Sequence, residues 1–289
     1  MKRTEELLIE NCQDAWPKLY YYLAFELIQE YGLKGEKVVR NGVRKFGIDR
    51  GETLRKMHIK YGIDINMKSL FTYYDLPGDP RFRRRQISLT EEQRLSETLV
   101  CPIAELWIDY NAKAIGRIYC EEFHHAMWGA YAEGTQVNLG QTLTQDGDNH
   151  CRFSVYYRKA NAKNDIEENK AEFTPLDYKE PHYRDGVEML ATKIFNHITL
   201  SALDIIGVNV LETIKNSTRL FAIDLAKQQK DFAKSLSIEI TDEWLSKYLP
   251  FKLNQSEPFG FWLNFDNDIP FKIFKEVFYP NFEAELSRI

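Results

Sequence analysis

Cys101 and Pro102 are the first residues whose types and spacing could support chemistry. The cysteine follows a β-prone run over residues 94–100, and the proline fits the first turn of a helix. A thiol at a helix start lies beside unpaired backbone N–H groups and the positive end of the helix dipole, which lower its pKa. The position therefore predicts a nucleophilic thiolate at Cys101, while a buried or capping cysteine is the alternative.

Helical spacing downstream of Pro102 predicts one helix over residues 103–127. A stripe along it would hold Glu105, Asp109, Gly116, Cys120 and His124. The stripe fits either the wall of a polar pocket or a solvent face. In the first case Cys120 and His124 form an alternative nucleophile–base pair, and the two carboxylates are candidates for proton transfer.

Residues 121–125 contain two overlapping Glu-x-x-His spacings, from Glu121 and Glu122 to His124 and His125. Such spacings supply iron ligands in ferritin-like bundles, but there a second motif completes the site. The sequence has no second motif of this kind. We therefore expect neither a metal nor a cofactor, and interpret these residues as a surface charge cluster.

The elements that must position these residues change in character along the chain. Helical spacing covers residues 4–31, with an interruption at Pro17, and residues 36–61, where three glycines indicate breaks or close packing. Residues 70–74, 85–89 and 94–100 predict short strands. Residues 136–144 and 151–158 predict an antiparallel hairpin, because residues 145–149 are typical turn residues.

Helical spacing returns over residues 184–236, and residues 244–289 are rich in aromatic side chains. The pattern predicts an α+β fold, in which an antiparallel sheet with the hairpin packs against helices and a helical extension follows. We divide the chain into an α+β core over residues 1–158 and a mostly helical extension over residues 159–289. If the extension packs on the same core, the whole chain forms one domain.

Bulk properties argue against nucleic-acid and membrane partners. The net charge is −5 over 289 residues, and no charge-free stretch is long enough to span a membrane. Arg81, Arg83, Arg84 and Arg85 are the local exception, for which we favour a solvated strand end over an anion-binding patch. The N-terminus does not resemble a signal peptide, so we expect a cytoplasmic protein with four free thiols.

Several short motifs together resemble the L-2-amino-thiazoline-4-carboxylic acid hydrolase family. They are Cys101-Pro102-x-x-Glu105-x-Trp107, Gly116-x-x-Tyr119-Cys120, Gly129, Gly134, Leu143, and Gly147-Asp148-x-x-Cys151-x-Phe153. The glycine-bearing stretch Arg40-x-Gly42, Phe46-Gly47 and Arg50-Gly51 is also similar. The resemblance covers residues 34–158. Where we align His124, the family usually has an acidic residue.

The resemblance implies hydrolysis of a cyclic C–N bond, of the amidine or thiazoline type, in a small carboxylate. It implies Cys101 as nucleophile, Cys120 second, with His124 assisting and Glu105 or Asp109 handling protons. Trp107 and Tyr119 would bind the substrate, and Arg117 or Arg50 its carboxylate. Two alternatives stay open, namely a non-catalytic small-molecule-binding module similar to 4-vinyl-reductase-type domains, and a specialised-pathway enzyme that acts on another C–N or C–S bond. A homo-oligomer is also left open.

Overall fold

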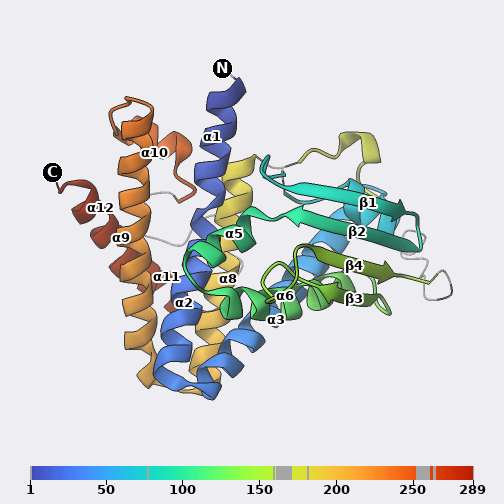
Figure 1. Cartoon of the computed structure of the whole chain (residues 1–289), viewed down its shortest axis with the longest axis horizontal. Coiled ribbons are helices and arrows are strands. Elements are labelled where there is room, and N and C mark those ends of the chain that lie inside the picture. Colours follow the sequence, from blue (N-terminus) through green and yellow to red (C-terminus); the bar gives the residue numbers. More distant parts are fainter. Residues whose placement is uncertain are drawn as a thin grey trace. The chain divides into compact units, whose positions relative to one another are not determined.

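The structure is a computed structural model, and it describes residues 2–76, 78–158, 160, 171–180, 182–251, 261–262 and 265–288. The chain forms two compact units (Figure 1). One contains residues 1–42 and 183–289, and the other contains residues 43–182. The boundary near residue 158 that we expected from the sequence stays a prediction.

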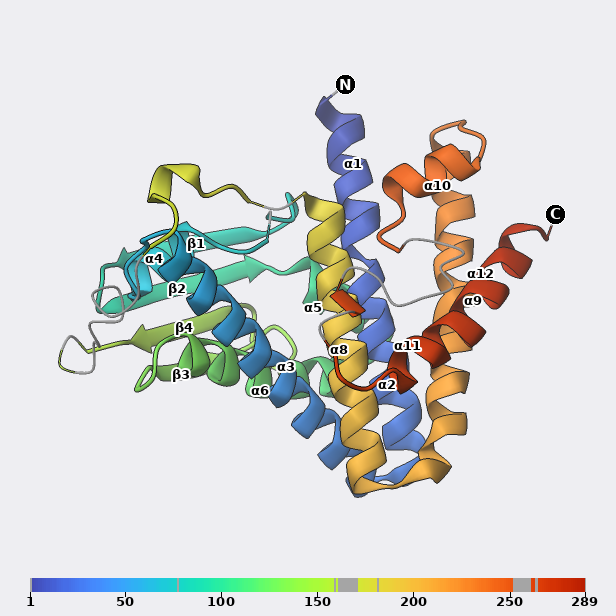
Figure 2. The ribbon, with the colours of Figure 1, turned by 180° about the vertical axis from the view of Figure 1, so that it is seen from behind.

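The first unit is helical. Its elements are α1 (Lys2–Gln13), α2 (Ala15–Tyr31), the first part of α3 (Leu33–Lys60), α8 (Tyr183–Ile205), η3 (Val208–Val210), α9 (Leu211–Ser235), α10 (Asp242–Tyr248), α11 (Ile269–Ile273), the π-helical turn η5 (Phe274–Phe278) and α12 (Tyr279–Leu286). Figure 2 shows these helices from behind. The aromatic C-terminal stretch supplies their core, where the Phe274 and Phe278 rings stack at 4.4 Å.

The predicted interruption of the N-terminal helix exists, but it lies three residues before Pro17. Asp14 separates α1 from α2, and Pro17 stands in the first turn of α2. A proline fits there because its missing N–H would have no partner inside the helix. Gly32 ends α2 with a φ of 55°, a backbone conformation that glycine adopts more readily than other residues.

The second unit combines the rest of α3 with a four-stranded antiparallel sheet. Its other elements are α4 (Met67–Thr72), β1 (Arg83–Leu89), β2 (Gln93–Val100), α5 (Pro102–Asp109), α6 (Lys113–Tyr131), β3 (Gln136–Gln141), β4 (Cys151–Tyr156) and η2 (Pro175–Asp177). The strand order is β1-β2-β4-β3. The α+β class and the β3–β4 hairpin are therefore confirmed.

One face of this sheet is covered by helix α6, and we call it the inner face. Paired residues of antiparallel strands point to the same side, so Ser96 of β2 and Phe153 of β4 share the inner face. The Phe153 ring lies 5.5 Å from the ring of Trp128 on α6. Cys151 and Val155, two residues to either side of Phe153 on β4, are buried on the same face.

Two predictions about individual elements are wrong. Residues 70–74 are not a strand, because Asn66 caps a helix there by accepting a hydrogen bond from the Ser69 N–H at 2.8 Å. The helix expected over residues 103–127 is two helices, α5 and α6. The chain turns between them at Asn111, which has a φ of 54°, a conformation that asparagine tolerates better than most residues.

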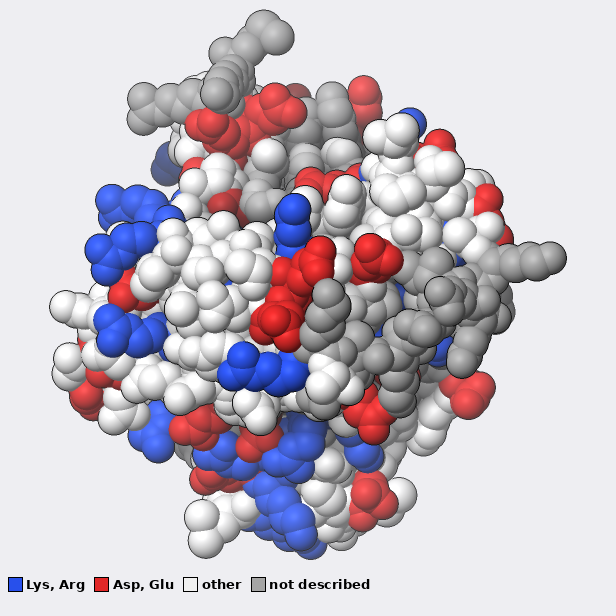
Figure 3. Space-filling model, turned by 90° about the vertical axis from the view of Figure 1, so that its right-hand side faces the viewer, with Lys and Arg blue, Asp and Glu red and all other residues white. Residues whose placement is uncertain are grey.

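The charged surface is mixed. Figure 3 shows basic and acidic side chains in small groups, next to one another and to uncharged residues. Among the described residues, no helix is both long enough and apolar enough to cross a membrane.

Candidate functional site

Cys101 lies where the sequence predicted, at the N-cap of α5. The backbone N–H groups of Ala104 and Ile103 at this helix start favour the thiolate, although no capping hydrogen bond to the Cys101 side chain is formed. Burial acts in the opposite direction and is stronger, so that the pKa of Cys101 is raised to about 12. The predicted low pKa is therefore wrong, and the thiol is protonated at neutral pH.

Two further thiols of this unit lie on other elements, near enough to Cys101 or to each other for an ionised thiol to influence its neighbour's pKa. Cys120 lies on α6, where the Thr144 hydroxyl is 3.9 Å from its sulfur. Burial raises the pKa of Cys120, and Cys151 and Cys101 raise it further through their own charges when ionised. Cys151 opens β4, and its sulfur accepts a hydrogen bond from the Leu143 N–H at 3.4 Å. All four cysteines of the chain are free thiols, as predicted.

The division into α5 and α6 breaks the predicted stripe. Glu105 and Asp109 are exposed on α5, whereas Gly116, Cys120 and His124 share a face of α6. Gly116 has a packing role, because a Cβ there would stand 2.5 Å from the Trp107 ring. Only the α6 part of the stripe therefore lies at the sheet.

His124 stands one turn beyond Cys120, against the inner face of the sheet. Its ring lies 4.9 Å from the rings of both Trp128 and Phe153. Its Nδ1 is buried and has no hydrogen-bond partner in the described part of the chain. Burial, followed by the positive charge of Arg94, lowers the pKa of His124 to about 3. The imidazole is therefore neutral at physiological pH.

The other candidate site residues have structural surroundings of their own. Trp107 and Tyr119 are buried, with ring centres 5.4 Å apart. Arg117 is exposed and pairs with Glu121 at 2.7 Å. Arg50 is buried and pairs with Asp75, with 2.6 Å between Nη2 and Oδ1.

Both arginines that we expected to bind a carboxylate thus already have acidic partners. The structure does not test the substrate-binding roles of Arg50, Arg117, Trp107 and Tyr119, nor the proton-transfer roles of the α5 carboxylates. These roles stay predictions.

Sequence reasoning missed Arg94. This residue of β2 pairs with Val155, which places its side chain on the inner face, and its Cζ lies 3.9 Å from the centre of the Phe71 ring. Burial, followed by the charge of Arg84, lowers the pKa of Arg94 to about 10. The alternation of side chains along a strand could have placed Arg94 on the inner face, because residues 94 and 96 of one strand point to the same side.

The described residues include no group of three or more His, Cys, Asp or Glu side chains that could hold a metal ion. Cys101, Cys120 and Cys151 are protonated thiols at neutral pH, and His124 is a neutral imidazole. The arrangement could support nucleophilic attack by a thiol on a bound small molecule.

Comparison with known proteins gives a family match for part of the chain. Residues 17–155 match the sequence model of the L-2-amino-thiazoline-4-carboxylic acid hydrolase family. Searches of curated proteins and of solved structures gave no significant match. The family match agrees with the resemblance carried by the cysteine and glycine motifs. The likeness of this chain to the L-2-amino-thiazoline-4-carboxylic acid hydrolase family therefore extends over residues 17–155.

Proposed function

We propose that this protein hydrolyses a thiazoline-type ring in a small carboxylate, with a cysteine thiol as nucleophile. The family match supports the coarser statement, a hydrolase-like role on this scaffold. The finer proposal is supported by Cys120, which lies one helical turn from His124 and near enough to Cys101 for an ionised Cys101 to raise the pKa of Cys120. A protonated thiol beside a neutral imidazole suits an uncharged nucleophile that loses its proton as it attacks.

In the proposed reaction, the sulfur of Cys101 adds to the carbon between the ring nitrogen and the ring sulfur. The thiol proton passes to the ring nitrogen, which is the most basic atom of an amidine. The bond from that carbon to the ring sulfur then breaks, the departing ring sulfur takes up the proton from the nitrogen, and an isothiourea adduct stays on Cys101. Attack by water releases a carbamoyl-cysteine product and restores the thiol, so that the net change is the addition of one water molecule.

His124 has a positioning role in this scheme. Because its pKa is about 3, it is a weak base, but its neutral ring can hold the thiol or the attacking water by a hydrogen bond. Glu105 and Asp109 are exposed on α5, where they can exchange protons with solvent. We propose a small molecule as the partner of this site, rather than a nucleic acid or a membrane.

The test is ring opening of L-2-amino-thiazoline-4-carboxylate by the purified protein, followed by mass spectrometry of the product. We expect Cys101→Ala to abolish turnover and Cys151→Ala to retain it at reduced stability. If Cys120→Ala abolishes turnover while Cys101→Ala retains it, the nucleophile is Cys120. Turnover in both variants would contradict cysteine catalysis, and analogues with other C–N or C–S bonds would then define the reaction.

The raised thiol pKa values favour one alternative, a binding module without turnover. A protein that only binds has no need of a thiolate, and burial keeps Cys101 protonated. Tight binding of the thiazoline carboxylate by the wild-type protein, with no product after long incubation, would support this alternative.

A further inference from the structure

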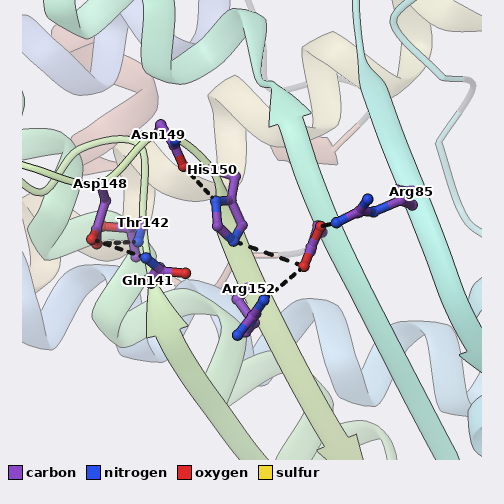
Figure 4. A network of polar contacts seen from close by, with 8 residues as sticks. Arg85, Gln141, Thr142, Asp148, Asn149, His150 and Arg152 are labelled. Atoms are coloured by element: carbon purple, nitrogen blue, oxygen red, sulfur yellow. Dashed lines mark hydrogen bonds and ion pairs between the residues drawn. The ribbon is translucent and has the colours of Figure 1, made fainter.

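Two arginines of the second unit lie on the outer face of its sheet, and both have an acidic partner. Arg85 and Arg152 converge on the Glu97 carboxylate, with 3.0 Å between the Arg152 Nη2 and Glu97 Oε1 (Figure 4). Hydrogen bonds from Arg152 and Arg85 lower the pKa of Glu97. The cluster ties β1, β2 and β4 together, and it gives each of these two arginines a carboxylate partner.

Two other arginines share the opposite, inner face. Arg84 pairs with Thr98, and Arg94 pairs with Val155, so strand alternation turns both side chains toward the face that α6 covers. In the described part of the chain, neither arginine has an ion pair with a carboxylate. The positive charge on this side of the sheet is therefore unbalanced.

Arg94 is held by aromatic rings in a way that keeps its donors available. Its Cζ lies 3.9 Å from the Phe71 ring centre, 5.8 Å from that of Phe153 and 6.0 Å from that of Trp128. Stacking uses the flat face of a guanidinium, whereas its N–H donors point outward in the plane of the group. Within the described residues, these donors make no hydrogen bond. They are arranged to take a carboxylate in the bidentate manner.

Further unpaired polar atoms lie along the same face. The Trp128 Nε1, the His124 Nδ1 and the Ser96 Oγ are buried, and none has a hydrogen-bond partner among the described residues. Trp128 and His124 are neighbours one helical turn apart on α6, and Ser96 lies two residues after Arg94 on the same side of β2. Buried donors and acceptors usually have partners, so a cluster of unpaired ones beside half-buried Arg94 suits the binding of a polar ligand or of water.

We propose that Arg94 binds the carboxylate of the substrate. This inference rests on the proposed function, since it assigns the anionic end of the same small molecule. Arg84 adds a second positive charge on the inner face, and the Trp128 N–H is a further donor for the carboxylate or the ring.

The spacing of the site fits a small substrate. Cys120 and Trp128 are eight residues apart on α6, which corresponds to about 12 Å along the helix axis. His124 lies midway between them, four residues from each. A five-membered ring held by its carboxylate at Arg94 would therefore lie beside His124, on the side of the thiols.

The experiment compares two ligands that share one ring, 2-aminothiazole-4-carboxylate and the neutral 2-aminothiazole. Both rings are aromatic and resist hydrolysis, so calorimetry measures binding without turnover. We expect the wild-type protein to prefer the carboxylate, and Arg94→Gln to lose roughly 10- to 100-fold in affinity for it, the range for hydrogen bonds between charged groups. Affinity for the neutral ring should stay unchanged. The affinity of Arg94→Lys for the carboxylate should lie between those of the wild-type protein and Arg94→Gln, because lysine keeps the charge without the bidentate geometry.

Arg158→Gln is the matched control. The Arg158 Cζ also lies over an aromatic ring, 4.9 Å from the centre of the Tyr156 ring, but the Arg158 side chain is exposed. This variant should bind both ligands as the wild-type protein does, and melting temperatures verify the folding of each variant.

The outcomes separate this inference from the proposed function. If Arg94→Gln keeps the preference for the carboxylate, or if the wild-type protein shows no such preference, the role of Arg94 is overturned even when ring opening occurs. If Arg94→Gln loses the preference while the wild-type protein never opens a thiazoline ring, the carboxylate site stands and the hydrolase proposal fails.

Discussion

Gly51 on α3 packs so closely against Met127 on α6 that a Cβ at Gly51 would stand 2.2 Å from the Met127 carbonyl oxygen. The same contact would bring this Cβ to 2.9 Å from the Ala130 Cβ. Gly47, one turn earlier, would place a Cβ 2.8 Å from that of Ala126. The glycines of α3 thus allow close approach of α6, the helix that carries Cys120 and His124.

Gly51→Ala should destabilise the protein, because the new methyl group must displace backbone atoms of α6. We expect a loss of about 1–3 kcal/mol in the free energy of unfolding, measured by urea denaturation. Gly129→Ala on α6 is the control, since no atom lies within 4 Å of a Cβ there and alanine favours helix by up to about 1 kcal/mol. Equal effects of the two substitutions would contradict the close contact.

The parts of the fold that the sequence predicted well depend on local interactions. The β3–β4 hairpin is an example, because Asp148 in its turn accepts a hydrogen bond from the Thr142 N–H at 2.9 Å. The glycines of residues 36–61 indicated either helix breaks or close packing. Because α3 is continuous and Gly47 and Gly51 lie against α6, close packing is the correct alternative. The missed helix α4 also had a local signal, its capping residue Asn66, but residues 70–74 favour strand by composition.

The site was only partly predictable, for a physical reason. The position of Cys101 at a helix start is local and was read correctly, whereas its pKa depends on burial by residues distant in the sequence. The same holds for Arg94, whose environment is made by Phe71, Trp128 and Phe153 from three different elements. Single-sequence patterns carry no information on such contacts between distant segments.

His124 should make the stability of the protein depend on pH. Its pKa is about 3 in the folded protein and about 6.5 in an unfolded chain, so between these values only the unfolded state binds the proton. Stability therefore rises with pH across this window and is lost on acidification. We expect His124→Phe, which keeps an aromatic ring beside Trp128 and Phe153, to reduce the loss between pH 7 and pH 4 by an amount on the order of 1 kcal/mol or more.

Urea denaturation at several pH values measures this effect. His58 is also buried, its Nδ1 lies 2.7 Å from the Tyr131 hydroxyl, and burial lowers its pKa in the same direction. It contributes equally to the wild-type protein and to the variant, so the difference between them isolates His124. Identical pH profiles would show that His124 is not buried in its neutral form.

The thiols should react slowly in the native protein, because burial raises their pKa values and only the thiolate is nucleophilic. Half-buried Cys101 and Cys120 should be alkylated before the buried Cys12 and Cys151. Limiting iodoacetamide at pH 7 to 10, followed by peptide mapping, ranks the four sites. In urea all four should react at the rate of a free thiol. If native Cys101 reacts faster at neutral pH than it does in urea, the backbone N–H groups at the start of α5 outweigh burial, and the nucleophile would already be a thiolate before substrate binds.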